Sequence, residues 1–105
     1  MAARRGFRST SMASRWRRRS MCVLIADLPC PAALRNVSAS GAFLETNARP
    51  PLGCSVELHH PEAGAISGTV RSLAGDGIAI GFDVSEQSVG FAMAAIASDM
   101  SRPAA

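Results

Sequence analysis

The sequence predicts a small domain made mainly of antiparallel β-strands, with an amphipathic helix at its C-terminal end and a basic arm before it. About six short segments of alternating apolar and polar residues follow one another, separated by turn residues, and this spacing is typical of a small barrel or sandwich. Near the end of the chain the apolar spacing becomes helical. With 105 residues, the chain has room for one domain with a modest core.

The basic charge is confined to the first residues. All 11 basic residues are arginines, and seven of them lie in residues 1–19, which contain no acidic residue. Residues 20–105 hold four arginines and eight acidic residues, so the rest of the chain is acidic. The arm therefore carries the positive charge, and the predicted domain does not.

An arm of this composition is compatible with several roles. Guanidinium groups bind phosphate bidentately, whether the phosphate belongs to a nucleotide, a nucleic acid or a lipid. A solvated disordered tail is the plain alternative. An Arg- and Ser-rich start without acidic residues is also the composition of an organellar transit peptide.

The first strands are expected at residues 21–26, 32–37 and 42–46. A turn is expected at Pro29-Cys30-Pro31, and a second one at residues 38–41, which read Ser-Ala-Ser-Gly. Residues 47–53 form a loop, because Pro50 and Pro51 cannot donate to a sheet ladder.

Three further strands follow this loop. Apolar and polar residues alternate over residues 54–59, and again over residues 66–71, with a turn at residues 61–64 between them. Residues 74–77, Ala-Gly-Asp-Gly, are a strong hairpin signal, and Ile78, Ile80 and Phe82 come next.

A helix is expected from residue 85 to about residue 97. Its apolar residues recur at helical spacing, and Phe91 and Met93 are expected to face the core. Asp83 or Ser85 is expected to cap the start, with Glu86 three residues after Asp83 as in a capping box. The recurring apolar residues are Val89, Ala92, Met93 and Ile96.

No enzyme motif appears in the sequence, so we expect a binding or regulatory module. The three cysteines Cys22, Cys30 and Cys54 lack C-x-x-C spacing, which argues against a zinc site or a disulfide scaffold. His59 and His60 are adjacent, point to opposite faces of a strand, and are read as surface and strand-end residues. No apolar run approaches the roughly 20 residues of a membrane span.

Two motifs occur in a fixed order. An R-x-x-x-R pair precedes the first strand, as Arg15 with Arg19 or as Arg4 with Arg8. An N-x-S-x-x-G motif, residues 36–41, lies between the second and third strands. With the strand pattern that follows, the chain resembles the PilZ domain family over roughly residues 15–96.

The resemblance implies a six-stranded antiparallel β-barrel and a cytoplasmic bacterial receptor for the second messenger cyclic di-GMP, with no other cofactor. It assigns ligand binding to Arg15, Arg19, Asn36, Ser38 and Gly41, with Arg15 and Arg19 preferred because Arg19 lies just before the first strand. The implied organisation is a disordered basic arm at residues 1–14, a PilZ-like domain at residues 15–98 and a flexible tail at residues 99–105.

These assignments suit the chemistry of the ligand. Arginine forks bind phosphate or the Hoogsteen edge of guanine, Asn36 both donates and accepts, and Ser38 adds a hydroxyl. Gly41 is expected to allow a positive φ or a close backbone approach. Ligand binding is expected to order the arm over the barrel and so to change docking to an unidentified protein partner.

Three alternatives stay open. Residues 36–41 are the composition of an ordinary turn. A barrel that has lost nucleotide binding would serve as a protein-interaction module. A polyanion binder would use the whole arm, but the acidic body and the few aromatic residues speak against nucleic acid.

Overall fold

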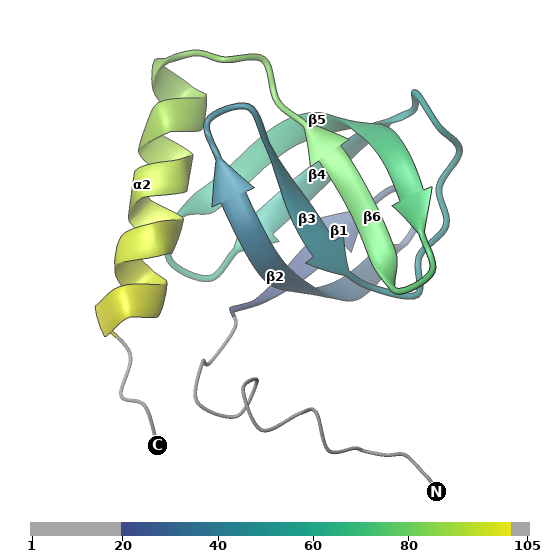
Figure 1. Cartoon of the computed structure of the whole chain (residues 1–105), viewed down its shortest axis with the longest axis horizontal. Helices are drawn as coiled ribbons and strands as arrows, with labels where there is room; N and C mark the ends of the chain where they lie inside the picture. Colours follow the sequence, from purple (N-terminus) through teal and green to yellow (C-terminus); the bar gives the residue numbers. More distant parts are fainter. Residues whose placement is uncertain (1–19, 102–105) are drawn as a thin grey trace, which may run out of the picture.

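Six antiparallel strands form a closed barrel, and one helix packs against it (Figure 1). The computed structural model describes residues 20–101. The elements are β1 (Met21–Ile25), β2 (Pro29–Ser38), β3 (Gly41–Glu45), β4 (Ser55–His60), β5 (Gly64–Ala74), β6 (Gly77–Gly81) and α2 (Glu86–Ser101). The strand order is β1-β2-β3-β6-β5-β4, and pairing of β1 with β4 closes the barrel. The structure thus confirms the six-stranded antiparallel barrel with a C-terminal helix.

Alternation along the strands builds the core. Inward-facing residues of all six strands are buried, while most of the residues between them are exposed or half-buried, except in β6, where Gly77 and Gly81 are also buried. Leu24, Leu44, Leu58 and Ile78 are completely buried. This interior fixes which side chains reach the outer surface, because each strand shows alternate residues to the two faces.

The expected turn at Pro29-Cys30-Pro31 was wrong, because these residues begin β2. The chain reverses at residues 26–28 instead. The Leu34 amide donates to the Ser20 carbonyl oxygen at 2.9 Å, so Ser20 and Leu34 form a hydrogen-bonded pair. Hydrogen-bonded and non-hydrogen-bonded pairs alternate along an antiparallel ladder, and this pair fixes which positions of β1 and β2 are which. Pro29 and Pro31 occupy the intervening pairs, where the ladder needs no N–H group from β2.

The turns predicted at residues 38–41 and 74–77 are both hairpin loops. Ser38 pairs with Gly41, which leaves the two-residue loop of residues 39–40 between β2 and β3. Ala74 pairs with Gly77, which leaves residues 75–76 between β5 and β6. Two-residue loops are the shortest hairpin connections, so these turns fix the register of both strand pairs.

The two longest strands, β2 and β5, each contain a β-bulge. The register of β2 against β3 shifts between Leu34 and Asn36, and that of β5 against β6 shifts between Val70 and Ser72. A bulge adds one unpaired residue, bends the strand and increases its twist. The extra residues here are Arg35 and Arg71, and this places two arginines at bends of the barrel wall.

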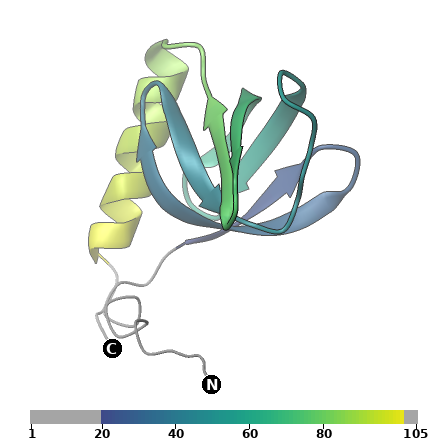
Figure 2. The same ribbon diagram turned by 45° about the vertical axis from the view of Figure 1, so that its right-hand side comes forward.

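The helix α2 lies beside β2 and spans one side of the barrel, as the two views show (Figure 1, Figure 2). Ser85 caps its start: the Ser88 amide donates to Ser85 Oγ at 3.2 Å, and the Ser85 amide donates to Ser88 Oγ at 2.9 Å. Ser85 was thus one of the two expected caps, but the reciprocal partner is Ser88 and not Glu86. The helix continues to Ser101, beyond the expected end near residue 97.

The helix turns a different face to the barrel than expected. Phe91 is 4% exposed and packs edge-on against Phe82 at 5.8 Å between ring centroids, but Met93 is 66% exposed. The expectation that Met93 faces the core was therefore wrong. The buried residues of α2 are Ser88, Phe91, Ala92 and Ala95, and a second apolar stripe, Val89, Met93, Ile96 and Met100, lies on the surface. Both stripes have helical spacing, so periodicity alone did not choose between them.

His60 is buried, which corrects its expected place on the surface. It ends β4 with its ring turned inward, edge-on to Phe91 at 6.0 Å between centroids. Its Nδ1 accepts hydrogen bonds from the amides of Glu62 and Ala63, both at 3.0 Å, and so holds the β4–β5 turn. His59 points to the opposite face of the strand, as expected for adjacent residues. There its Nε2 lies 2.8 Å from Glu57 Oε1.

Candidate functional site

The β2–β3 hairpin carries the N-x-S-x-x-G motif on the outside of the barrel. Asn36 and Ser38 are both exposed and lie two residues apart on β2, so their side chains project from the same face of the strand. The side chain of Asn36 makes no hydrogen bond to any other residue of the range 20–101. Its amide is therefore available to a ligand on this surface.

Ser38 has a structural role within the hairpin. Its Oγ accepts a hydrogen bond from the Ser40 amide at 3.2 Å and lies 3.0 Å from Ser40 Oγ. Serine side chains commonly stabilise turns in this way. A hydroxyl also keeps further donor and acceptor capacity, so the turn contact leaves Ser38 able to contact a ligand.

Gly41 is required by the packing of β3 against β6. A Cβ atom at this position would overlap the carbonyl oxygen of Ile80 and would lie 3.3 Å from the Cα of Gly81. In the described part of the chain, two glycines have a positive φ, Gly53 and Gly64. Gly41 does not have a positive φ. A positive φ is therefore not the reason for a glycine here. A close backbone approach is the reason, and the backbone that comes close is that of β6.

Arg15 and Arg19, and likewise Arg4 and Arg8, lie outside the described residues. The structure does place the residue that follows Arg19. Ser20 is completely buried, its carbonyl accepts from the Leu34 amide at 2.9 Å, and its Oγ donates to Asp99 Oδ1 at 2.6 Å. The junction of the arm is therefore anchored to β2 and α2, and Leu34 is two residues from Asn36 on the same strand.

Arg35 is a neighbour of the motif that sequence reasoning missed. Its guanidinium lies 4.4 Å from the centroid of the Phe43 ring, and its Nε donates to Glu45 Oε2 at 2.8 Å. Its Nη2 donates to Asp76 Oδ2 in the β5–β6 hairpin. This hydrogen bond lowers the pKa of Asp76 and, with that to Glu45, raises the pKa of Arg35. The bulge that brings Arg35 to this place had no signal in the sequence.

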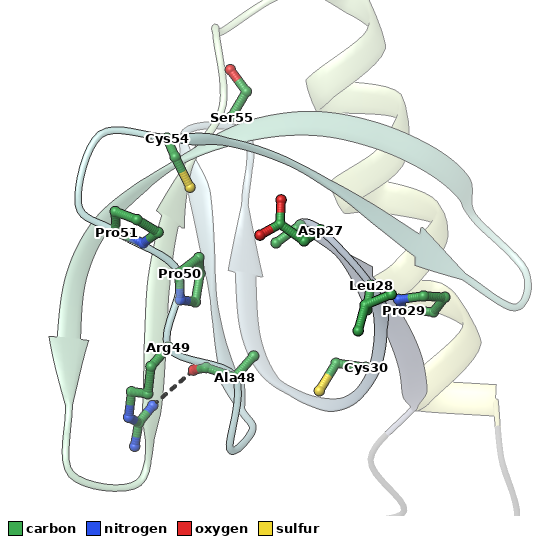
Figure 3. Close-up of a pocket in the computed structure, with 11 residues that line it drawn as sticks. Asp27, Leu28, Pro29, Cys30, Ala48, Arg49, Pro50, Pro51, Cys54 and Ser55 are labelled. Carbon is green, nitrogen blue, oxygen red and sulfur yellow. Dashed lines mark hydrogen bonds between the residues drawn. The ribbon is translucent and has the colours of Figure 1, made fainter.

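A pocket of about 550 Å³ lies at the other end of β2, away from the motif (Figure 3). Its walls come from the β1–β2 turn and from the loop between β3 and β4: Asp27, Leu28, Pro29 and Cys30 on one side, and Ala48, Arg49, Pro50, Pro51, Cys54 and Ser55 on the other. None of the motif residues lines it.

Arg49 is the cationic side chain of this pocket, and it is engaged by the protein. Its Nη1 donates to the carbonyl of Ala48 at 3.1 Å, and its Nη2 donates to that of Gly75 at 3.0 Å. The bond to Gly75 fastens the β3–β4 loop to the β5–β6 hairpin. The pocket lining is otherwise mostly apolar and includes the carboxylate of Asp27, so it does not suit a dianionic ligand.

Cys22 lies near the junction of the arm and is buried. Burial raises the pKa of its thiol to about 11, and the nearby Asp99 carboxylate adds to this rise. The thiol therefore stays protonated at neutral pH. Within residues 20–101, no three side chains of the metal-binding types cluster together, and all three cysteines are free.

Comparison of this chain with protein-family models, curated proteins and solved structures gave no match. No helix in the described part of the chain has the length and apolar character to cross a membrane. The residues and their arrangement therefore carry the functional argument on their own.

Proposed function

We propose that this chain is a receptor domain for cyclic di-GMP, as its resemblance to PilZ domains implies. One observation supports the proposal: Ser20, at the junction of the arm, is hydrogen-bonded to β2 close to the second motif. Ser20, which is bonded directly to Arg19, pairs with Leu34, and Asn36 lies two residues further along β2. Arginines entering from the arm and the amide of Asn36 would then contact the same ligand.

The chemistry of the hairpin supports this ligand class. Asn36 offers one acceptor and two donors to the edge of a guanine base, and Ser38 offers a hydroxyl. Arg15 and Arg19 supply planar forks for the two phosphates, and the body of the domain is acidic, so the arm is the natural source of positive charge.

Ligand binding would order the arm against the outer face of β2. Seven arginines without an acidic neighbour repel one another in the free chain, and a dianion relieves this repulsion. The ordered arm would cover part of the hairpin and present a changed surface to a protein partner. Slower amide exchange in residues 15–19 at saturating ligand is the signature of this step.

Calorimetric titration with cyclic di-GMP, with GTP in a parallel titration, tests the proposal. We expect the wild-type chain to bind cyclic di-GMP selectively. Arg19→Ala and Asn36→Ala should each weaken binding about tenfold or more, because each removes a hydrogen bond that involves a charged or polar ligand group. Replacing Arg4, Arg5 and Arg8 together is the control and should leave this affinity nearly unchanged.

A barrel that does not bind nucleotides is the second candidate. It is favoured by the structural roles of Ser38, which stabilises the turn, and of Gly41, which packs against β6. In this case cyclic di-GMP gives no heat even at high concentration, and the function must be sought among protein partners. Binding of any polyanion, lost when Arg4, Arg5 and Arg8 are replaced, would instead indicate a generic role for the arm.

A further inference from the structure

The outer surface beside the motif has a floor of glycine backbone. Ser38 of β2 pairs with Gly41 of β3, Gly41 pairs with Gly81 of β6, and Gly81 pairs with Thr69 of β5. These four residues form a row across four strands, and the two central positions have no side chain. The row is therefore low in its middle, and a side chain from a neighbouring strand can lie over it.

Arg71 reaches onto this floor from the far side. It is the extra residue of the β5 bulge, and its guanidinium lies over Gly81, where an added Cβ atom would be only 2.6 Å from Nη2. Gly81 is buried although it occupies an outward-facing position of β6, because the guanidinium covers it. The bulge thus aims Arg71 toward the motif and not along its own strand.

The charge of Arg71 is not compensated by a neighbouring residue. The part of the chain that the structure describes contains three arginines: Arg35, Arg49 and Arg71. Arg35 is paired with Glu45 and Asp76, and Arg49 is held by backbone carbonyls. Arg71 has neither an ion pair nor a hydrogen bond to the residues described, and it is exposed. Of the three described arginines, Arg71 is the one that can bind an anion without first breaking an internal contact.

We propose that Arg71 is a further ligand-binding residue, which holds a phosphate of the cyclic dinucleotide bidentately above the Gly41–Gly81 floor. This inference rests on the proposed function and extends its site from β2 to β5, beyond the two sequence motifs. Strands lie about 4.8 Å apart, so the guanidinium over β6 is roughly 10 Å from the motif side chains on β2. One phosphate is too small to touch both sides, whereas a dinucleotide reaches from one to the other.

Calorimetric titration of the full chain with cyclic di-GMP tests this residue with four variants: Arg71→Ala, Arg71→Lys, Asn36→Ala and Gln87→Glu. We expect Arg71→Ala to weaken binding about tenfold or more. Arg71→Lys keeps the charge but loses the planar fork, so it should bind with intermediate affinity. Gln87→Glu is the charge control. It lowers the net charge by one unit, as Arg71→Ala does, but at an exposed position of α2, and it should bind like the wild type.

A second measurement is local to the side chain. The Nε–Hε resonance of Arg71, assigned by its loss in Arg71→Lys, should shift when cyclic di-GMP is added to the wild-type chain. Binding by Arg71→Ala within twofold of the wild type, together with an unmoved resonance, would overturn the inference. If Asn36→Ala is weakened at the same time, the proposed function survives that result. Absence of binding by the wild-type chain would overturn both.

Discussion

The buried thiol of Cys22 predicts that the domain loses stability in a defined alkaline range. The folded chain holds this thiol at a pKa of about 11, whereas the ordinary value is 9.0. Unfolding exposes the thiol to water and allows it to ionise near its ordinary pKa. Since the folded pKa is raised, the stabilisation is fully present below pH 9 and is lost as the pH rises toward 11.

The size of the effect follows from the two pKa values. At pH 10 the thiol is ionised in most unfolded molecules and protonated in most folded ones. This pH lies about one unit above the pKa of the unfolded chain, and one pKa unit corresponds to at most about 1.4 kcal/mol of unfolding free energy. For a small domain, with an m-value in urea of about 1–2 kcal/mol/M, the urea midpoint should fall by on the order of 1 M between pH 8 and pH 10. The chain contains no lysine and no tyrosine, so few other side chains titrate in this range.

Urea unfolding followed by circular dichroism, with a reductant present, measures this at pH 8, 9 and 10. The variant Cys22→Ala should have a nearly constant midpoint over this range. Cys30→Ala and Cys54→Ala are the controls and should keep the decrease seen in the wild type. An equally large decrease in Cys22→Ala would refute the reasoning, because the titrating group would then be elsewhere.

Two further predictions concern the packing. Phe91→Ala should lower the unfolding free energy by about 3–5 kcal/mol, as for other buried aromatic residues, whereas Met93→Ala should change it by less than about 0.5 kcal/mol; similar losses in urea titrations of both would contradict the observed orientation of α2. Gly41→Ala should destabilise by about 1–3 kcal/mol because its methyl group meets the β6 backbone. The matched control Gly90→Ala, on the exposed side of the helix with open space around it, should stabilise by up to about 1 kcal/mol; equal stability of the two variants would show that β3 and β6 can move apart.

Local patterns gave the elements and most of the turns. The alternation along β4 and the Ala-Gly-Asp-Gly signal at residues 74–77 predicted their strands and hairpin correctly, because period and turn chemistry act over a few residues. Pro29 and Pro31 were misread as a turn, since a proline is excluded from a strand only where the ladder needs its N–H group. That need depends on the register with β1, which local sequence does not contain.

The same distinction applies to the candidate site. The resemblance to PilZ domains pointed to the motif residues Asn36, Ser38 and Gly41, and the hairpin brings them to one end of β2 and β3. Arg35 and Arg71 were not identified, because their positions depend on two bulges. A bulge is decided by how two strands match over their whole length and by the curvature that the barrel needs to close.

The sequence by itself determined the β-rich class, the capped C-terminal helix, the separation of a basic arm from an acidic body, and the motif. Only the tertiary structure decided which stripe of α2 is buried, why Gly41 must be a glycine, and which arginines have a free charge. The physical reason is that propensity, period and charge are properties of neighbouring residues. Burial, close approach of backbones and compensation of charge are properties of residues such as Arg35 and Asp76, which meet only when the barrel closes.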